Sequence, residues 1–426
     1  MSAFKEYAEY DGLGLAELIR RKQVTAEDVI EAAIDRIEQT NPRVNAVVQK
    51  MYDEGRRVAR AGLPAGLLSG VPFLLKDLYV GQKGFRSGNG SRLYDGYFAE
   101  IDFTLTERYQ AAGLAILGRS NTPEFGLNAA TEPAVNGPTF NPWNLSRSAG
   151  GSSGGAAAAV AAGMVPAAHA TDGGGSIRIP AANCGVFGMK PSRARNPVGP
   201  IAGEGWSGMA VGHAVSWSVR DNAALLDASS GPAPGDPYFM PPPARPFLSE
   251  VGANPGALRI ALMAKAPSGV EVHPECTAAA VDAARLCEQL GHRVEETAPE
   301  LDPDGLRWAM TAIIAANLRA NIDQRLAALK RPQRDGDLER ITVQWAELGR
   351  KLTAADYARA ITIIHGIGRR LGAFFQKFDL LLSPVLAEPP LPIGATNMMG
   401  NDLEVYLDRL YRLIPFTPWF NASGGP

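Results

Sequence analysis

Apolar and polar positions at the start of the chain follow a helical spacing. Apolar residues recur every three or four positions over 12–22 and again over 25–42, which predicts two amphipathic helices. Thr25 and Asp28 have the spacing of a capping box at the start of the second helix. Pro42 should end that helix. We expect both helices to pack as a layer against the main body of the protein.

Short apolar runs then alternate with more polar segments. The runs 44–48, 71–75 and 114–117 predict strands, and the spacing over 52–61 and 103–112 predicts helices between them. This alternation is typical of an α/β fold.

The remaining chain continues the pattern with longer helices. A proline- and glycine-rich stretch at 231–256 predicts a surface excursion, and 303–376 reads as helical throughout. In the helix predicted at 274–290, the inward face should hold Ala280, Ala283, Ala284, Cys287 and Leu290. Further elements are expected at 156–163 (helix), 167–171 (strand), 258–262 (strand) and 380–382 (buried strand).

The composition is that of an ordinary globular protein. Hydrophobic residues make up 46% and charged residues 20% of the 426 positions, and the formal net charge is −2. This balance gives no electrostatic reason to expect nucleic acid or an anionic membrane as a partner. Three cysteines are too few for a disulfide framework, and the first residues lack an apolar signal segment, so we expect a cytoplasmic protein.

The stretch 148–192 holds the candidate chemistry. It contains two glycine-rich turns, at 150–155 and 172–176, each of which presents one serine, Ser152 or Ser176. Glycine allows close approach of main chain to main chain, so such turns can surround a reacting atom with N–H donors. In the second turn the donors would be the amides of Gly173, Gly174, Gly175 and Ser176.

A nucleophilic serine needs a base, and the sequence offers two kinds. Histidine is the usual base, and the chain has five. The other candidate is Lys76, which ends the apolar run 71–75; burial would lower its pKa and favour the neutral amine. Asp77 should point to the opposite face of the strand, because strand side chains alternate.

Four blocks together resemble one known family. They are G-V-P-F-L-L-K-D at 70–77, the stretch 148–192, S-V-R-D-N-A-A-L-L-D at 218–227 and F-D-L-L-L-S-P at 378–384. The chain resembles the amidase signature family over nearly its whole length. Within the family it is most similar to the hydrolases of 6-aminohexanoate cyclic dimer and their amidase relatives.

The resemblance implies a role for each residue of the glycine-rich stretch. Ser176 matches the family nucleophile, Ser152 matches the bridging serine that follows a cis peptide bond, and Lys76 matches the base. Ser153, Asp172 and Arg178 would surround this triad, the last two as a pair that braces the oxyanion turn. The polar turn at 118–124 would lie near the site, although a surface turn is an equal alternative.

The resemblance also implies the fold, which agrees with the alternating pattern. We expect one domain over 1–426, with a large twisted mixed sheet flanked by helices on both faces. Residues 1–65 would form the N-terminal helical layer, 66–230 the catalytic core, and 231–426 the rest of the core with the helices of the substrate pocket. Segments 122–128, 200–217 and 303–376 should shape that pocket.

The expected activity is hydrolysis of a small carboxamide through an acyl-enzyme, without metal or organic cofactor. Three alternatives stay open. Gly150-x-Ser152-x-Gly154 fits the nucleophile elbow of a Ser-His esterase, for which His365 would be one base to test. The family's tRNA-dependent amidotransferase branch shares the triad. An inactive truncated homologue is the third alternative.

Two further expectations concern assembly and the chain end. A homodimer is the assembly to test first, and neither nucleic acid nor a membrane is expected as a partner. Phe420–Pro426 resembles the beginning of the family's last block, so the C-terminus looks truncated, with an unpaired sheet edge that would favour self-association.

Overall fold

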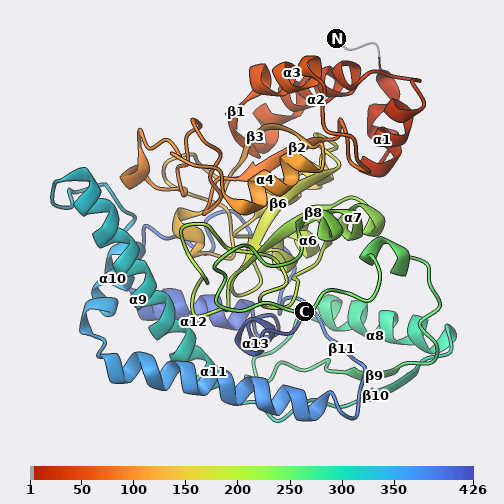
Figure 1. Cartoon of the computed structure of the whole chain (residues 1–426). Coiled ribbons are helices and arrows are strands. Elements are labelled where there is room, and N and C mark those ends of the chain that lie inside the picture. The colour runs from red at the N-terminus through yellow and green to blue at the C-terminus, as the bar shows by residue number, and fades with distance from the viewer. Residues whose placement is uncertain (1–3) are drawn as a thin grey trace.

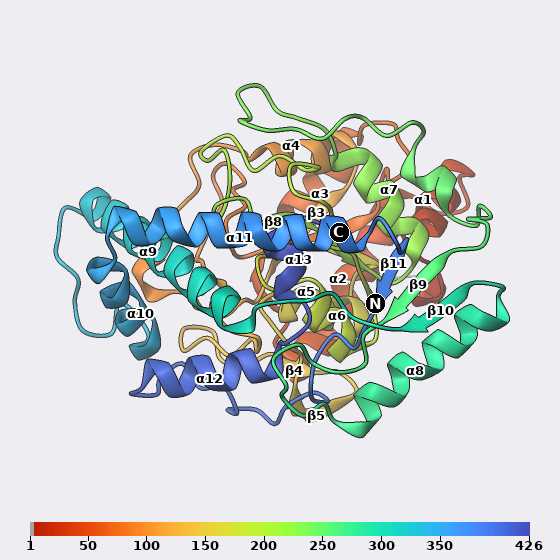
Figure 2. The same ribbon diagram turned by 90° about the horizontal axis from the view of Figure 1, so that it is seen from below.

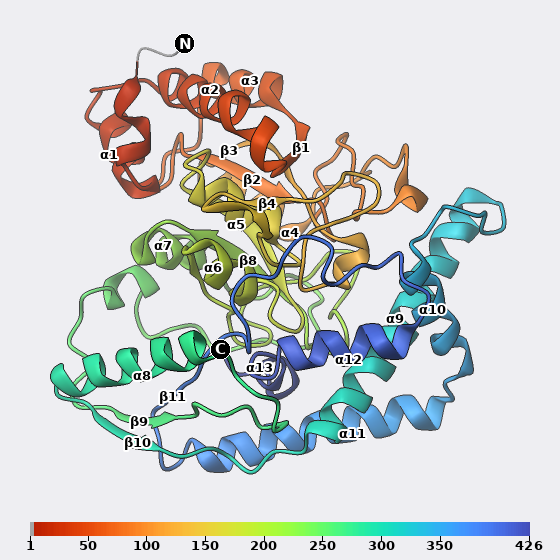
Figure 3. The same ribbon diagram turned by 180° about the vertical axis from the view of Figure 1, so that it is seen from behind.

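A computed structural model describes residues 4–426 and places a mixed β-sheet at the centre of the molecule (Figure 1). Helices α1–α3 lie at one end of the molecule, and helices α9–α13 lie at the other (Figures 1 and 3). The helices are α1 (Gly12–Arg20), α2 (Ala26–Val44), α3 (Tyr52–Ala61), α4 (Thr104–Ala111), α5 (Gly154–Ala161), α6 (Arg178–Cys184), α7 (Val219–Ser229), α8 (Pro274–Gln289), α9 (Pro303–Leu329), α10 (Arg340–Lys351), α11 (Ala354–Phe374), α12 (Leu403–Leu413) and α13 (Pro418–Ser423).

The strands form three sheets. They are β1 (Val47–Lys50), β2 (Pro72–Lys76), β3 (Ala115–Ser120), β4 (Phe140–Asn141), β5 (Asn144–Ser148), β6 (Ala167–Asp172), β7 (Phe187–Gly188), β8 (Val211–Ser216), β9 (Arg259–Leu262), β10 (Arg293–Glu296) and β11 (Leu380–Leu382). The main sheet has the order β1-β3-β2-β6-β8-β7; β10-β9-β11 form a second sheet and β4-β5 a small hairpin. The predicted α/β fold with a mixed sheet is confirmed, and the C-terminal strands form their own small parallel sheet.

Strands β2 and β6 at the centre of the main sheet run parallel. Phe73 pairs with Ala167 and Leu74 with Ala168. The carboxyl ends of parallel neighbours meet at the same edge of a sheet, which is where ligands bind in open α/β folds. Lys76 at the end of β2 and Asp172 at the end of β6 therefore lie at this edge.

Alternation along β2 decides which face each side chain takes. Phe73 and Leu75 pack with residues of α4 and α7, whereas Leu74 packs with residues of α2 and α5. Lys76 has the same parity as Leu74, so its side chain lies on the α5 side of the sheet. The N-terminus of α5, which follows Ser152 and Ser153, is on this side.

The end of α2 differs from the prediction. The capping box of Thr25 and Asp28 is present, but the helix continues through Pro42 to Val44. Asn45 then ends it in a left-handed conformation with φ 53°. Pro42 is tolerated because only its own N–H is lost near the last turn, where the left-handed residue closes the helix.

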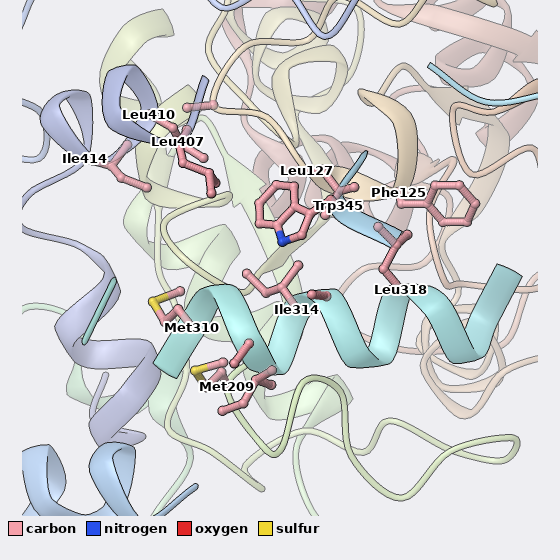
Figure 4. Close-up of a cluster of buried hydrophobic side chains, with 14 of the residues drawn as sticks. Phe125, Leu127, Met209, Met310, Ile314, Leu318, Trp345, Leu407, Leu410 and Ile414 are labelled. Carbon is pink, nitrogen blue, oxygen red and sulfur yellow. The ribbon is translucent and has the colours of Figure 1, made fainter. Parts of the chain in front are cut away.

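The C-terminal helices surround a second large core. Figures 2 and 4 show α9 running through this region, with Met310, Ile314 and Leu318 beside Trp345 of α10. The region 303–376, predicted to be helical throughout, is mostly helical but contains three helices, and the chain leaves helical geometry between α9 and α10.

Peripheral elements are more exposed than predicted. Leu290, expected to point inward, is 68% exposed at the end of α8, since β9 and β10 cover only one side of that helix. Ala280 and Ala284 are buried as predicted. Leu380 of β11 is 49% exposed because β11 is an edge strand. Within residues 4–426, no helix has both the length and the apolar content needed to cross a bilayer.

Candidate active site

The first glycine turn brings Ser152 and Ser153 to the start of α5. The peptide bond between Gly151 and Ser152 is cis, as the resemblance implied. A Cβ on Gly151 would lie 2.7 Å from the main-chain oxygens of Asn128 and Ala130, so only glycine fits this position. Both serine side chains are buried.

Lys76 reaches this turn from the end of β2. Its Nζ lies 2.7 Å from Ser152 Oγ and 2.9 Å from both Ser153 Oγ and Thr171 Oγ1. Ser153 in turn donates to the main-chain oxygen of Thr171 at 3.2 Å. The amine therefore sits in a cage of three hydroxyls.

The environment of Lys76 favours its neutral form. The side chain is fully buried, and this desolvation lowers its pKa well below the usual value, with the charge of Asp172 acting in the opposite direction. The Asp77 carboxylate has other partners than the Lys76 amine. It accepts from the Gly88 amide at 2.8 Å and lies 3.9 Å from an Arg119 nitrogen.

The second glycine turn is shaped by Asp172. Its carboxylate accepts from the amides of Gly175 at 2.8 Å and Ile177 at 3.1 Å. Arg178 binds both carboxylate oxygens, at 2.8 and 2.9 Å. Burial opposes ionisation of Asp172, yet the Arg178 guanidinium and these hydrogen bonds hold its pKa below its usual range.

One predicted oxyanion donor is already in use. The Gly175 amide points at Asp172, so the prediction that it faces the substrate is wrong. Among residues 4–426, the amides of Gly173, Gly174 and Ser176 have no hydrogen-bond acceptor. These three remain available to a ligand.

Sequence reasoning missed a brace from the end of the chain. Thr417 Oγ1 donates to the Gly174 carbonyl at 2.7 Å, and the fully buried Asn421 donates to Asp172 Oδ1 at 2.9 Å. Arg178 also donates to Asn421 Oδ1 at 2.7 Å. The only signal in the sequence was that Phe420–Pro426 resembles a family block. The contact between this C-terminal segment and the glycine turn, some 240 positions upstream, leaves no pattern in the nearby sequence that could predict it.

Ser152 and Ser176 open into one cavity of about 250 Å³. The two hydroxyls make no direct hydrogen bond in the described chain, and catalytic hydrogen bonds often shorten only when substrate binds. The predicted pocket segments all contribute to the wall, and so do several residues that were not predicted. The lining residues from segments outside the prediction are Leu78, Tyr79, Val80, Phe103, Leu105, Pro197, Val198 and Gly199.

The turn at 118–124 is buried, unlike a surface turn. Residues 118–120 belong to β3, and Phe125 and Gly126 directly after the turn line the cavity. This arrangement favours the location near the site.

The histidines do not supply an obvious base. His169 lines the cavity, but its Nδ1 accepts from the Lys76 amide, and burial lowers its pKa well below the usual value. His213 pairs with Asn222 at 2.8 Å. His365 lies within α11 and does not line the cavity. No histidine of residues 4–426 hydrogen-bonds to Ser152 or Ser176, and no group of acidic, cysteine or histidine side chains there could hold a metal ion.

Comparison with known proteins decides the family. The Amidase family model matches residues 28–426. The chain belongs to the amidase signature family. As an amidase it is an enzyme that acts on amides.

Similar relatives of this amidase have named activities. It is 36% identical to the 6-aminohexanoate-cyclic-dimer hydrolase of Pseudomonas sp. strain NK87, over 98% of this chain and 86% of the relative. It is 32% identical to the acylamidase of Rhodococcus erythropolis, over 89% of this chain and 79% of the relative.

Solved structures agree with this assignment. A 6-aminohexanoate cyclic dimer hydrolase complexed with substrate superposes with a TM-score of 0.92 at 35% identity, over 98% of this amidase and 89% of that chain. A bacterial aryl acylamidase gives a TM-score of 0.89 at 30% identity, over 97% of this amidase and 88% of that chain. A glutamyl-tRNA(Gln) amidotransferase component from Thermotoga maritima, at 24% identity, shares the fold alone.

Proposed function

We propose that this amidase hydrolyses a small carboxamide through an acyl-enzyme on Ser176, with Ser152 as proton bridge and Lys76 as base. The observation that supports this best is the 2.7 Å contact between Lys76 Nζ and Ser152 Oγ. Ser152 and Ser176 line the same cavity, which supports a proton path from Ser176 through Ser152 to Lys76.

The first half-reaction forms the acyl-enzyme. Neutral Lys76 accepts the Ser152 proton, Ser152 accepts the Ser176 proton, and Ser176 Oγ attacks the carbonyl carbon. A C–O bond forms, and the carbonyl π electrons move to oxygen. When the tetrahedral intermediate collapses, the C–N bond breaks, and the proton returns through Ser152 to the departing nitrogen as an amine.

The second half-reaction uses water in place of Ser176. Water gives its proton to the same Ser152–Lys76 path and attacks the ester carbonyl. Collapse breaks the bond to Ser176 Oγ, which recovers a proton, and the carboxylic acid leaves. The free amides of Gly173, Gly174 and Ser176 are the candidates to bind the oxyanion in both halves.

The proposed substrate is uncharged and largely apolar. The cavity wall consists mostly of apolar side chains and glycine, and the one acidic residue among those that line it, Glu204, is exposed. Two relatives more than a third identical are named for 6-aminohexanoate cyclic dimer, which makes that cyclic bis-amide the first compound to test.

The test is to locate the acyl group and remove its carrier. Ser176→Ala should abolish turnover of amides, whereas Ser152→Ala should leave a trace, because Ser176 can still attack slowly without its bridge. Intact-mass and peptide mass spectrometry of Ser152→Ala after mixing with substrate should show the acyl group on Ser176. Full activity in Ser176→Ala, or an acyl group on another residue, would refute the assignment.

A further inference from the structure

His169 is a buried, titratable side chain that the proposed mechanism does not use. It belongs to β6, is 1% exposed and lines the cavity that holds Ser152 and Ser176. Its Nδ1 accepts a hydrogen bond from the main-chain N–H of Lys76 at 3.3 Å. The imidazole therefore contacts the main chain of the proposed base and not its amine.

The place of this hydrogen bond follows from the end of the ladder between β2 and β6. The last paired residues of these two strands are Leu74 and Ala168. The Asp77 amide donates to a main-chain carbonyl of β3 at 3.0 Å. Because the N–H groups of successive strand residues point to opposite sides, the Lys76 amide points toward β6, beyond the last main-chain pair. There the His169 side chain supplies the acceptor.

A second residue of β6 contacts the other end of Lys76. Thr171 Oγ1 lies 2.9 Å from Nζ. Strand β6 thus binds this lysine at its main-chain N–H and at its amine, the two ends of a flexible four-carbon chain. Fixing the start of that chain limits the positions that Nζ can reach, and so supports its 2.7 Å contact with Ser152 Oγ.

The surroundings of His169 keep its Nδ1 available as an acceptor. Burial lowers the pKa of His169 well below its usual value, and the charges of Lys76, of Arg119 in β3 and of His213 in β8 act in the same direction. The Tyr109 ring of α4 packs against the imidazole, with the ring centroids 6.0 Å apart. In a neutral ring that accepts at Nδ1, the proton is on Nε2.

We propose that His169 is a positioning residue for the base: its imidazole replaces the missing ladder partner of Lys76 and holds the end of β2 so that Nζ meets Ser152. This inference rests on the proposed function, because it takes Lys76 as the base. Loss of the acceptor would free the end of the strand, and a small displacement of Nζ is enough to slow proton transfer. His169 acts through Lys76 and exchanges no proton with the substrate.

Two amide variants separate the roles of the two ring nitrogens. In His169→Asn, Oδ1 is as many bonds from the main chain as Nδ1 and can accept from Lys76. In His169→Gln, the amide nitrogen takes the place of Nε2, and the acceptor at Nδ1 is lost. His169→Phe keeps a ring and removes both nitrogens. The matched control is His213→Phe, since His213 is buried in the neighbouring strand β8 and does not line the cavity.

Steady-state kinetics with the amide that the wild type cleaves fastest give kcat, KM and the pH–rate profile. His169→Phe should lower kcat about 10- to 100-fold and change KM by less than about threefold. The midpoint of the fall in kcat/KM at low pH should move up by about half a pH unit or more, because water reaches a loosely held amine and its pKa returns toward the usual value.

The other variants should divide into two groups. His169→Asn should restore most of kcat and the wild-type midpoint, whereas His169→Gln should resemble His169→Phe. His213→Phe should keep the wild-type midpoint. Nitrogen-15 NMR of the imidazole in the unaltered protein provides a measurement that needs no variant. Nδ1 should be unprotonated and Nε2 protonated at neutral pH, and a protonated Nδ1 would overturn the inference even if no variant at position 169 folds.

The kinetic outcomes distinguish this inference from the proposed function. Wild-type kcat and midpoint in His169→Phe overturn the role of His169, and so does a loss of kcat without a shift of the midpoint, which marks a purely structural residue. Rescue by glutamine and not by asparagine overturns it as well, in favour of a contact from Nε2 to substrate. If Lys76→Met keeps the fall at low pH, the proposed base and this inference fail together. If Lys76→Met loses that fall and no His169 variant moves it, the inference alone fails.

Discussion

Replacing Asn421 tests whether the end of the chain holds the catalytic turn. Asn421 is fully buried in α13, donates to Asp172 Oδ1 at 2.9 Å and to the Met209 carbonyl at 3.1 Å, and accepts from Arg178 at 2.7 Å. Asn421→Ala removes all of these bonds at once and admits no obvious replacement from solvent.

The magnitude follows from the kinds of bond that are lost. Two of the bonds involve a charged partner, for which about 1.5–3 kcal/mol each is typical; the bonds to the main-chain oxygens of Asp172 and Met209 share the two amide hydrogens with them and add about 1 kcal/mol. Arg178 and Asp172 keep their own ion pair, which limits the loss. We expect the free energy of unfolding to fall by about 3–5 kcal/mol. A shift of the turn amides by a fraction of an ångström should lower kcat by about 10- to 100-fold.

Urea titration followed by tryptophan fluorescence measures the stability, and steady-state kinetics with one amide measures kcat and KM. Ser423→Ala is the matched control, because Ser423 ends the same helix and contacts neither Asp172 nor Arg178. An Asn421→Ala protein as stable and as active as the control would show that the brace contributes nothing to the turn.

Two further predictions concern the base and the oxyanion turn. As pH falls, kcat/KM of the wild type should fall, because burial lowers the pKa of Lys76 and protonation of this lysine removes the base. Lys76→Met should lose most of the activity, and its pH–rate profile should lack this fall at low pH. An unchanged fall at low pH in the variant would indicate another base. Gly173→Ala would place a Cβ 2.5 Å from the Trp206 ring, so we expect kcat/KM to drop at least about 10-fold. Gly174→Ala, with Met310 at an ordinary 3.5 Å, should retain more activity in the same assay, and equal losses would contradict the steric explanation.

The sequence predicted the parts of the site that depend on local pattern. The apolar run before Lys76 predicted a buried strand, and the glycine turns predicted where Ser152 and Ser176 would be presented; the structure places Lys76 against Ser152. Parallel pairing of β2 with β6 then explains why residues about 95 positions apart meet.

Long-range and geometric features were beyond the sequence pattern. The Gly175 amide is directed at Asp172 by the path of the turn, which no residue type encodes. Thr417 and Asn421 meet the turn through tertiary contacts. Asn317 lies in a helix that was predicted only as part of a long helical region, so its direction toward the cavity could not be read from spacing. The fold, not the local sequence pattern, brings such residues to the site.

These tertiary contacts bear directly on the proposed base. Asp172 is the charge that favours protonated Lys76, in opposition to burial. Its negative charge is balanced by Arg178 on one side and hydrogen-bonded by Asn421 on the other. A carboxylate compensated in this way attracts a proton at Lys76 less than a free one would, so it can shape the turn without restoring the ammonium. The C-terminal helix therefore supports the triad twice, by fixing the turn that presents Ser176 and by helping to occupy the one carboxylate that opposes a neutral lysine.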